Sequence, residues 1–345
     1  MSGCKSFVTL VMTATIFSGA ALYAQELPGV DGSKPINLAT SKQMLPGVPG
    51  LPQKLNSLPL SLAVSPDGLW VVAINAGYGT YESHYWESLA VMDTTTGKIT
   101  DFPDERMKPH ASQTFFSGLA ISKDGTKVYA SVASVSDAAG LGKNAVGNGV
   151  AVFSLENGVL KPAAFFRLPL VKLAKGRTTQ EGRGARRDLG VPYPAAITLT
   201  SKNKLLIAEN LADAVVLMDA KSGKIEHTFD LSETDAVPST YPIATAVTAD
   251  GKRGFVALWN GSEVAELDLT TGHVVRKVTL LKPSSPTDPG THPCALLLDE
   301  HSGLLYVALS NRDAVAAIDI GKGSATKLQV HGYFDTRLPG QTYFG

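Results

Sequence analysis

The chain has 345 residues, 44% of them hydrophobic, and its 31 Lys and Arg residues balance its 31 Asp and Glu residues. A chain of this length and hydrophobic content can bury a large core. The formal net charge of zero excludes a general electrostatic attraction to nucleic acid or to an anionic membrane surface, so we expect neither as a partner.

The first 24 residues have the pattern of a cleavable signal peptide. A lysine precedes a mostly apolar stretch from Phe7 to Leu22, and the segment ends in small residues. Two cleavage points stay open. Cleavage after Ala24 leaves the large Leu22 three residues before the cut, whereas cleavage after Ala21 leaves a glycine there. The apolar run is short for a membrane anchor, so we predict a periplasmic or secreted protein with no membrane span after cleavage.

Only two cysteines occur, Cys4 in the signal segment and Cys294. The mature chain therefore has one thiol and no internal disulfide, and its stability must come from its core. Because Cys294 lies in the apolar run PCALLL, we expect a small buried hydrophobic residue rather than a reactive thiol.

Residues 25–58 are rich in Pro, Gly and Ser. This composition predicts an extended N-terminal arm, with one strand near Gln53 to Asn56.

The clearest structural unit runs from Tyr241 to Leu280. It contains four short apolar runs separated by Asp250-Gly251, Asn260-Gly261 and Thr271-Gly272. Dipeptides of this kind between β-rich runs are strong hairpin signals, because Gly, Asn and Asp adopt positive φ at little cost. The unit therefore predicts four consecutive antiparallel strands.

The same unit recurs along the chain, beginning near Pro59, Ser117, Tyr193 and His292. Asp219, Asp268 and Asp319 close the third strand of successive units and are 49 and 51 residues apart. A four-strand repeat of this period predicts an all-β β-propeller of four-stranded blades. We expect blades at residues 59–102, 117–166, 193–231, 241–280 and 292–332, within a propeller domain of residues 59–345.

The last five residues, QTYFG, resemble QTFFSG at 113–118, which leads into the second blade. A sixth blade therefore begins where the chain stops. Two alternatives follow: five blades that close with some rearrangement, or the front part of a longer propeller, such as a seven-bladed one, which we favour. In either case the N-terminal arm has a plausible docking place as a strand that completes the last blade.

Loop lengths divide the propeller into two faces. The turns after the first and third strands are tight, whereas the connections between strands two and three, and those between blades, are long. In an up-and-down blade these two sets lie on opposite faces of the disc. We call the second set the long-loop face and expect binding there, because long loops on a rigid scaffold are where function usually resides.

The long-loop face carries the residues that we predict to bind a ligand: Tyr78, His84, Trp86, His110, Arg183, Arg186, Asn210, Asn260, His292 and Asn311. The three histidines come from different loops without metal-like spacing, so we predict no metal site and no cofactor. The two arginines belong to a basic insertion at residues 168–192. We expect this insertion to be a solvated loop, and the alternative is that it docks an anionic group.

Two recurring polar sets have a structural interpretation. Asp93, Asp219, Asp268 and Asp319 precede tight turns, where a carboxylate accepts backbone N–H bonds. We expect Asn75 and its counterparts at the end of the other second strands to serve turns in the same way. His227, His273, His301 and His331 are expected to be solvated.

The repeats SPDGLWVVAINAG, YPAAITLTSKNKLLIAENLADAVVLMDAKSGKIEHTF and HPCALLLDEHSGLLYVALSNRDAVAAIDI resemble the YVTN, or YncE-like, β-propeller repeats of exported bacterial proteins. The resemblance covers about Pro59 to Ile320. The pattern departs at Ser154, where Asp is expected, and at Lys202-Asn203, which replaces Asp-Gly. NAGYGTYES, DFPDERM and QTFFSGLAISKDG resemble a subgroup with a C-terminal phosphoesterase domain. That resemblance implies metal-dependent hydrolysis downstream of this chain and carries no catalytic residue onto it.

We therefore predict a binding or scaffolding module that takes an unknown protein or small-molecule ligand on its long-loop face. The alternatives are the propeller part of a phosphoesterase-type hydrolase, or a lactonase-like hydrolase with a metal in its channel. The chain has no Gly-x-Ser-x-Gly elbow, phosphate-binding loop or cysteine pair with metal spacing, which weakens an enzymatic interpretation.

Overall fold

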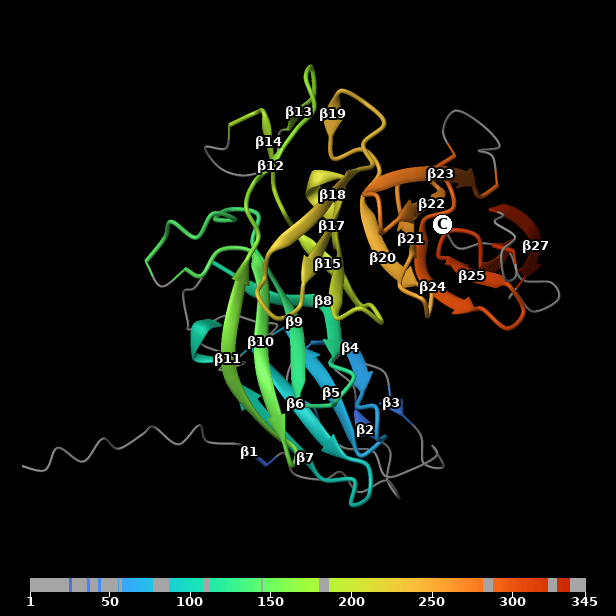
Figure 1. Cartoon of the computed structure of the whole chain (residues 1–345). Helices are drawn as coiled ribbons and strands as arrows, with labels where there is room; N and C mark the ends of the chain where they lie inside the picture. Colours follow the sequence, from blue (N-terminus) through green and yellow to red (C-terminus); the bar gives the residue numbers. More distant parts are fainter. Residues whose placement is uncertain are drawn as a thin grey trace, which may run out of the picture.

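The computed structural model describes residues 25–26, 36–37, 43–44, 55, 58–76, 87–107, 112–143, 145–179, 186–281, 288–321 and 328–335. Within these residues, five antiparallel blades follow one another along the chain (Figure 1); four of them have four strands, and a short strand of the N-terminal arm adds a fifth to the first. The first two contain β4 (Pro59–Val64), β5 (Trp70–Asn75), β6 (Ser88–Asp93), β7 (Ile99–Pro103), β8 (Thr114–Ile121), β9 (Lys127–Ala133), β10 (Gly149–Glu156) and β11 (Val159–Arg167).

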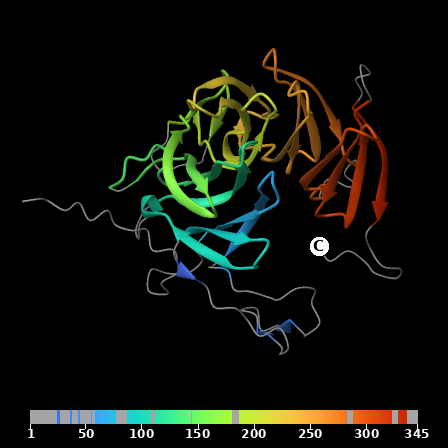
Figure 2. The ribbon, with the colours of Figure 1, turned by 60° about the horizontal axis from the view of Figure 1, so that its bottom comes forward.

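The last three blades contain β15 (Pro194–Leu199), β16 (Lys204–Glu209), β17 (Ala214–Asp219), β18 (Ile225–Asp230), β20 (Pro242–Val247), β21 (Arg253–Leu258), β22 (Glu263–Asp268), β23 (His273–Thr279), β24 (Pro293–Asp299), β25 (Leu304–Leu309), β26 (Ala314–Asp319) and β27 (Gln329–Asp335). Short 3-10 helices occur at Glu105–Met107 and Asn210–Ala212. The predicted all-β propeller is confirmed, and Figure 2 shows the blades arranged around an arc.

The first strand of each blade is the innermost one. Contacts between consecutive blades run from β4 to β8, β8 to β15, β15 to β20 and β20 to β24. Strands two, three and four then follow outward in chain order. The residue just before a first strand therefore lies near the axis of the arc. A site at the centre of the propeller would be built from such residues.

The hydrophobic core lies between neighbouring blades. Side chains alternate along each strand, so one face of a blade packs on the blade before it and the other on the blade after it. Ile74 and Phe102 of blade 1 pack with Phe115 and Phe153 of blade 2, and Leu217 of blade 3 packs with Val256 and other residues of blade 4. Burial of these apolar surfaces is the main stabilising contribution.

The tight turns form as predicted. Asp219 Oδ1 accepts hydrogen bonds from the backbone N–H of Ser222 at 2.8 Å and of Lys221 at 3.2 Å, and Asp93, Asp268 and Asp319 cap their turns in the same way. Hydrogen bonding lowers the pKa of the Asp219 carboxyl, through the Ser222 side chain first. These carboxylates are turn caps, which confirms their structural interpretation.

A second device joins one blade to the next. The residue just before the third strand bonds to the segment that leads into the following blade, which we call the lead-in segment. The 0% exposed Asp213 carboxylate accepts bonds from the backbone N–H of Ser239 at 2.5 Å and of Thr240 and Tyr241 at 3.0 Å. Glu87 accepts from Phe115 N–H at 2.5 Å, and Ser262 Oγ from Thr291 N–H at 2.9 Å. We call these residues lead-in clamps.

The basic insertion contains short strands. β12 (Val171–Lys172) pairs with β14 (Leu189–Gly190), and β13 (Thr178–Thr179) pairs in parallel with β19 (Ala236–Val237). Arg177 bonds to Asp230 at 2.5 Å at the end of β18. Figure 1 shows these short strands together at one end of blade 3. The insertion therefore forms a small cap whose basic side chains Lys172, Lys175, Arg186 and Arg187 are exposed to solvent, so its described residues agree with the solvated interpretation apart from these short strands.

Two described residues of the N-terminal arm pair with the first blade. β1 (Gln25–Glu26) pairs with β7, and β2 (Ile36–Asn37) pairs with β3 (Gln43–Met44). The arm was expected on the last blade, and β1 instead extends the outer edge of blade 1. Of the strand predicted at residues 53–56, only Leu55 is described, and it is not in a strand. The signal segment and residues 341–345 lie outside the described residues.

Cys294 is exposed, so the prediction of a buried thiol is wrong. It lies on the innermost strand of blade 5, where a register irregularity separates Pro293 from Ala295. The apolar run continues past this point, but one side of β24 has no covering blade among the described residues. Its neighbour Leu297 is 67% exposed for the same reason.

Blades 1 and 5 each expose apolar side chains on the face opposite to the neighbouring blade, although Ala73, Ala90 and Ile99 of blade 1 are buried there beside Leu55. On blade 1, Leu62 (66%) and Val64 (60%) lie on the face opposite to blade 2. On blade 5, Leu297 and Phe334 lie on the face opposite to blade 4. Within the described part of the chain, no helix is long and apolar enough to cross a membrane.

Candidate functional site: an aromatic cluster on the long-loop face

Half of the predicted ligand-binding residues can be located. Tyr78, His84, Trp86, His110 and Arg183 lie outside the described residues. Arg186 is 73% exposed at its side chain and pairs with Asp188, two residues away, at 2.6 Å. Arg186 lies three residues before β14, so it belongs to the cap formed by the insertion. Asn210, Asn260, His292 and Asn311 all lie on the long-loop face, as the strand order requires.

Three partly buried rings form what we call the aromatic cluster: Tyr241, Trp259 and His292. The Trp259 and His292 rings are stacked, with centroids 3.8 Å apart and planes 24° apart. Tyr241 meets Trp259 edge-on at 6.1 Å. Tyr241 and His292 precede the innermost strands of blades 4 and 5, and Trp259 follows the second strand of blade 4. The cluster therefore joins two blades near the axis.

The lead-in segments hold two of these rings in an uncommon backbone conformation. Tyr241 has φ 51° and His292 has φ 45°, and each precedes a proline, which further disfavours helical φ and ψ. The Asp213 clamp bonds to Tyr241 N–H, and the Ser262 clamp bonds to the residue before His292. Leu58, just before the first strand of blade 1, has the same conformation (φ 53°), whereas Tyr193 before the first strand of blade 3 does not. The clamp hydrogen bonds hold the backbone at the two rings of the cluster.

The predicted asparagines stabilise the lead-in segments. The Asn260 amide donates to the Ser239 carbonyl at 2.7 Å, and the Asn210 amide donates to the Pro242 carbonyl at 3.1 Å. Asn311 donates its backbone N–H to the Thr291 carbonyl at 3.3 Å. Asn260 is exposed next to Trp259, and an amide offers two donors and an acceptor. Asn260 is therefore the described polar residue that we expect to contact a ligand bound on the cluster.

Asn75 does not serve a turn, and that prediction is wrong. It is 0% exposed, and its amide donates to Ser88 Oγ and to Asp101 Oδ1, both at 3.2 Å. The second and third strands of blade 1 are paired, and Asn75 lies opposite Ser88 in this pairing. The result is a buried polar group inside the blade.

A second ring pair and a titratable carboxyl lie beside the neighbouring blades. Phe116 and Tyr193 meet edge-on at 5.0 Å. Burial raises the pKa of Glu87 to about 8, against a smaller opposing effect of its bond from Phe115 N–H. Burial also raises the pKa of Tyr193, with a further contribution from the Glu87 charge. Glu87 is therefore protonated near neutral pH and ionised in mild alkali.

The described residues contain no group of three or more His, Cys, Asp or Glu side chains placed to hold a metal ion. His292 stacks on Trp259 instead. His227 is partly buried, and His273, His301 and His331 are exposed on outer strands or turns. The sequence singled out His292 but missed Tyr241 and Trp259. The signal available was the aromatic residue that recurs just before a first strand at Tyr193, Tyr241 and His292.

Comparison with known proteins shows the fold. No protein-family model matches the chain, and no curated protein matches it. The structure of a periplasmic gluconolactonase from Pseudomonas aeruginosa is similar over 90% of this chain and 82% of its own, with a TM-score of 0.60 and 14% identity. The structure of a putative 6-phosphogluconolactonase from Bacteroides fragilis is similar over 86% of this chain and 75% of its own, with a TM-score of 0.56 and 16% identity. A β-propeller domain from Myceliophteria thermophila has a TM-score of 0.53 and 12% identity over 82% and 73%. These neighbours support a β-propeller, including propellers named as lactonases.

Proposed function

We propose that this chain is a ligand-binding β-propeller that holds a small polyhydroxylated ring against the aromatic cluster. The observation that carries the proposal is the Trp259–His292 stack beside Tyr241, formed by two blades on the long-loop face and partly exposed. Partly exposed aromatic rings on a rigid scaffold are typical of contact surfaces. They offer flat apolar faces at little entropic cost, because the clamps already fix them.

The chemistry of the cluster favours a ring over an open chain. An aromatic face packs against the apolar face of a ring, whereas an open polyol must lose conformational freedom before it can do the same. Asn260 adds a hydrogen-bonding group next to Trp259. The gluconolactonase and 6-phosphogluconolactonase names of the structural neighbours support sugar-derived lactones as the ligand class.

The test is calorimetric titration with methyl β-D-glucopyranoside, which is locked as a ring, and with D-glucitol, which is open. We expect the ring to bind more tightly, and Trp259→Ala to weaken ring binding about tenfold, equivalent to about 1.4 kcal/mol. Trp70→Phe is the matched control, because Trp70 begins β5 at the opposite end of its blade. Equal binding of both probes, or unchanged binding to Trp259→Ala, would overturn the proposal.

The second candidate function is lactone hydrolysis, which Glu87 favours. Its pKa of about 8 gives a carboxylate in mild alkali, beside the Phe116–Tyr193 pair. The carboxylate accepts a proton from water as the water oxygen attacks the lactone carbonyl, and the proton passes to the ring oxygen as its bond to the carbonyl carbon breaks. We expect the hydrolysis rate of D-glucono-1,5-lactone to rise as pH passes through about 8. Glu87→Gln should abolish the rate above the spontaneous one and leave glucoside binding intact, whereas a flat pH profile excludes this role.

Export and a phosphoesterase context stay predictions from the sequence. Fractionation of cells that express the chain tests the first. A periplasmic or secreted product shortened by 21 or 24 residues supports export, and an uncleaved cytoplasmic product contradicts it. The mass of the native protein in its source cells tests the second, because a much larger product places any phosphoesterase chemistry beyond Gly345.

A further inference from the structure

Glu209 is a carboxyl at a position where the two following blades have leucine. It is the last residue of β16 and pairs with the first residue of β17. The same register positions hold Leu258 in blade 4 and Leu309 in blade 5. All three are 2% exposed or less, and both leucines belong to the cores between blades. Blade 1 has the buried Asn75 at this position, but its amide is hydrogen-bonded to Ser88 and Asp101. Glu209 is therefore an acidic group at a position that the neighbouring blades fill with leucine.

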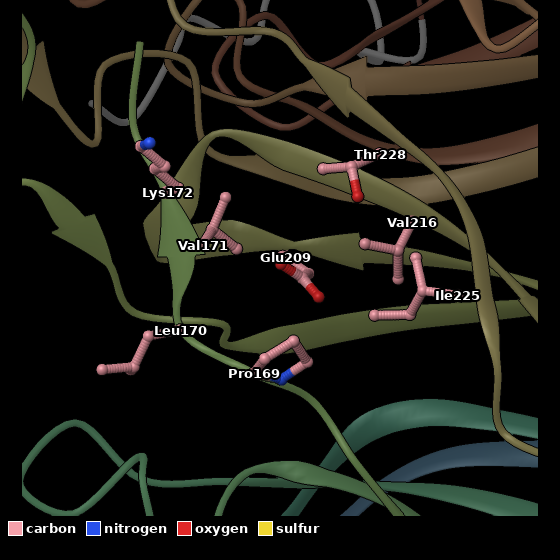
Figure 3. A pocket seen from close by; sticks show the side chains of 8 residues that line it. All are labelled: Pro169, Leu170, Val171, Lys172, Glu209, Val216, Ile225 and Thr228. Atoms are coloured by element: carbon pink, nitrogen blue, oxygen red, sulfur yellow. The ribbon is translucent and has the colours of Figure 1, made fainter. Parts of the chain in front are cut away.

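A cavity of about 250 Å³ lies over this carboxyl, between blade 3 and the start of the basic insertion. Its lining residues are Pro169, Leu170, Val171, Lys172, Glu209, Val216, Ile225 and Thr228. Figure 3 shows the Glu209 carboxyl in the middle of this lining, with the Thr228 hydroxyl directed toward the same space. Pro169, Lys172 and Thr228 are exposed, so the cavity opens to solvent on their side and Glu209 forms its floor.

Neither carboxyl oxygen of Glu209 has a hydrogen-bond partner within the described part of the chain. Burial of a polar group without a partner is costly, and burial of an unpaired charge costs more. The walls supply apolar side chains from β12, β17 and β18. A polar floor with no partner under apolar walls has the arrangement of a binding site whose polar contact comes from a ligand.

We propose that this cavity binds a small apolar primary amine, whose ammonium group pairs with Glu209. An ammonium supplies three N–H donors and a positive charge, which satisfies both carboxylate oxygens. A neutral alcohol supplies one donor, and a carboxylate ligand is repelled. The five apolar wall residues receive the body of the ligand. This site is separate from the aromatic cluster and does not depend on the function proposed for it.

Charge around the cavity is compatible with a cationic ligand. Lys172 on β12 is the one other charged residue of the lining, and its exposed side chain extends away from Glu209 in Figure 3. The lining residues of β17 and β18 do not titrate. Burial raises the pKa of Glu209 to about 8. Near neutral pH the carboxyl is therefore mostly protonated, and pairing with an ammonium releases that proton.

The cavity volume sets the ligand size. It corresponds to about eight water molecules at their liquid volume. Cyclohexylmethylamine fits this size and is the probe, with cyclohexylmethanol and cyclohexanecarboxylate as neutral and anionic counterparts. Calorimetry on the full chain should give a dissociation constant on the order of 1 mM or lower for the amine. We expect binding of the alcohol to be at least tenfold weaker and no binding of the carboxylate.

Proton release distinguishes pairing with Glu209 from simple filling of the cavity. At pH 7, titration in two buffers of different ionisation heat should show close to one proton released per amine bound. Glu209→Gln keeps the side-chain shape and should lose both the proton release and the preference for amine over alcohol. Glu226→Gln removes a carboxylate on the same blade that pairs with Lys204 outside the cavity, and should change neither.

Three results would overturn the proposal: no binding of the amine, equal binding of amine and alcohol by the unmodified chain, or unchanged amine binding by Glu209→Gln. Thermal melts of both variants establish that they are folded. Trp259→Ala should bind the amine as the unmodified chain does, so failure at the aromatic cluster and failure here are distinguishable.

Discussion

At the scale of single residues, Glu209 lowers the stability of the folded chain because it places a polar group without a partner inside the core. Its counterparts Leu258 and Leu309 show that the blade accepts leucine at this position. Glu209→Leu should therefore raise the free energy of unfolding by about 1–3 kcal/mol near neutral pH, because it removes a buried group without a partner. Urea denaturation of the two proteins measures the difference. A destabilised Glu209→Leu protein would contradict this account of the position.

The same carboxyl makes stability depend on pH. Its pKa is raised from 4.5 to about 8 in the folded chain. Below about pH 4.5 both states hold the proton, whereas between about pH 4.5 and 8 the unfolded state releases it more readily, so stability falls as pH rises. The gain from Glu209→Leu should therefore grow from pH 4.5 to 8 and then level off. Glu87 shifts in the same direction but is present in both proteins, so its effect cancels. A gain independent of pH would contradict the raised pKa.

At the scale of strands and turns, the lead-in clamps and the turn caps use similar residues for different tasks. Asp213 is buried and bonds to three consecutive backbone N–H groups of the next blade's lead-in. Asp268 is a turn cap that accepts from Thr270 and Thr271. The first contact joins two blades, and the second closes one hairpin.

Asp213→Ala should lower the free energy of unfolding by about 2–4 kcal/mol, because it leaves several buried donors without a partner. Asp268→Ala should cost about 1 kcal/mol, since its turn stays solvated. Urea denaturation measures both. Because Asp213 bonds to Tyr241 N–H, its loss should also weaken ring binding at the aromatic cluster, and Asp268→Ala should not. Equal losses in the two variants would argue against a special role for the clamps.

The blades were predictable from the sequence because their signals are local. Asp-Gly and Thr-Gly turns fix strand ends within a few residues, and the predicted blade at 241–280 matches β20 to β23. The clamps were missed because Asp213 and Tyr241 are far apart in the chain and no local pattern links them. The exposure of Cys294 was missed because an apolar run does not reveal whether a neighbouring blade covers it. Within the cluster, His292 was predicted as a ligand-binding residue. Trp259 was missed because its stacking on His292 arises from the contact between blades 4 and 5, which no local pattern shows.

At the scale of the whole molecule, the first and the last described blade each expose apolar side chains of their innermost strand. Leu62 on blade 1 and Leu297 on blade 5 are 66% and 67% exposed. Apolar faces of this kind promote association in water. The isolated chain should therefore self-associate with rising concentration in sedimentation experiments, and the double variant Leu62→Glu, Leu297→Glu should reduce this.

The control for that experiment is Leu141→Glu. Leu141 is 88% exposed but lies in the loop between β9 and β10, away from both apolar faces. Its substitution should leave association unchanged. A chain that stays monomeric at all concentrations, or an equal effect of Leu141→Glu, would show that the two faces do not drive association.

The central claim is that the aromatic cluster is the ligand site, and the most direct measurement observes the indole N–H signals of the three tryptophans by NMR. Trp→Phe variants assign the signals, and methyl β-D-glucopyranoside is then titrated. We predict that the Trp259 signal shifts with saturation and that the Trp70 signal does not. A Trp259 signal that stays fixed while calorimetry detects binding would contradict the claim, because the ligand would then bind elsewhere.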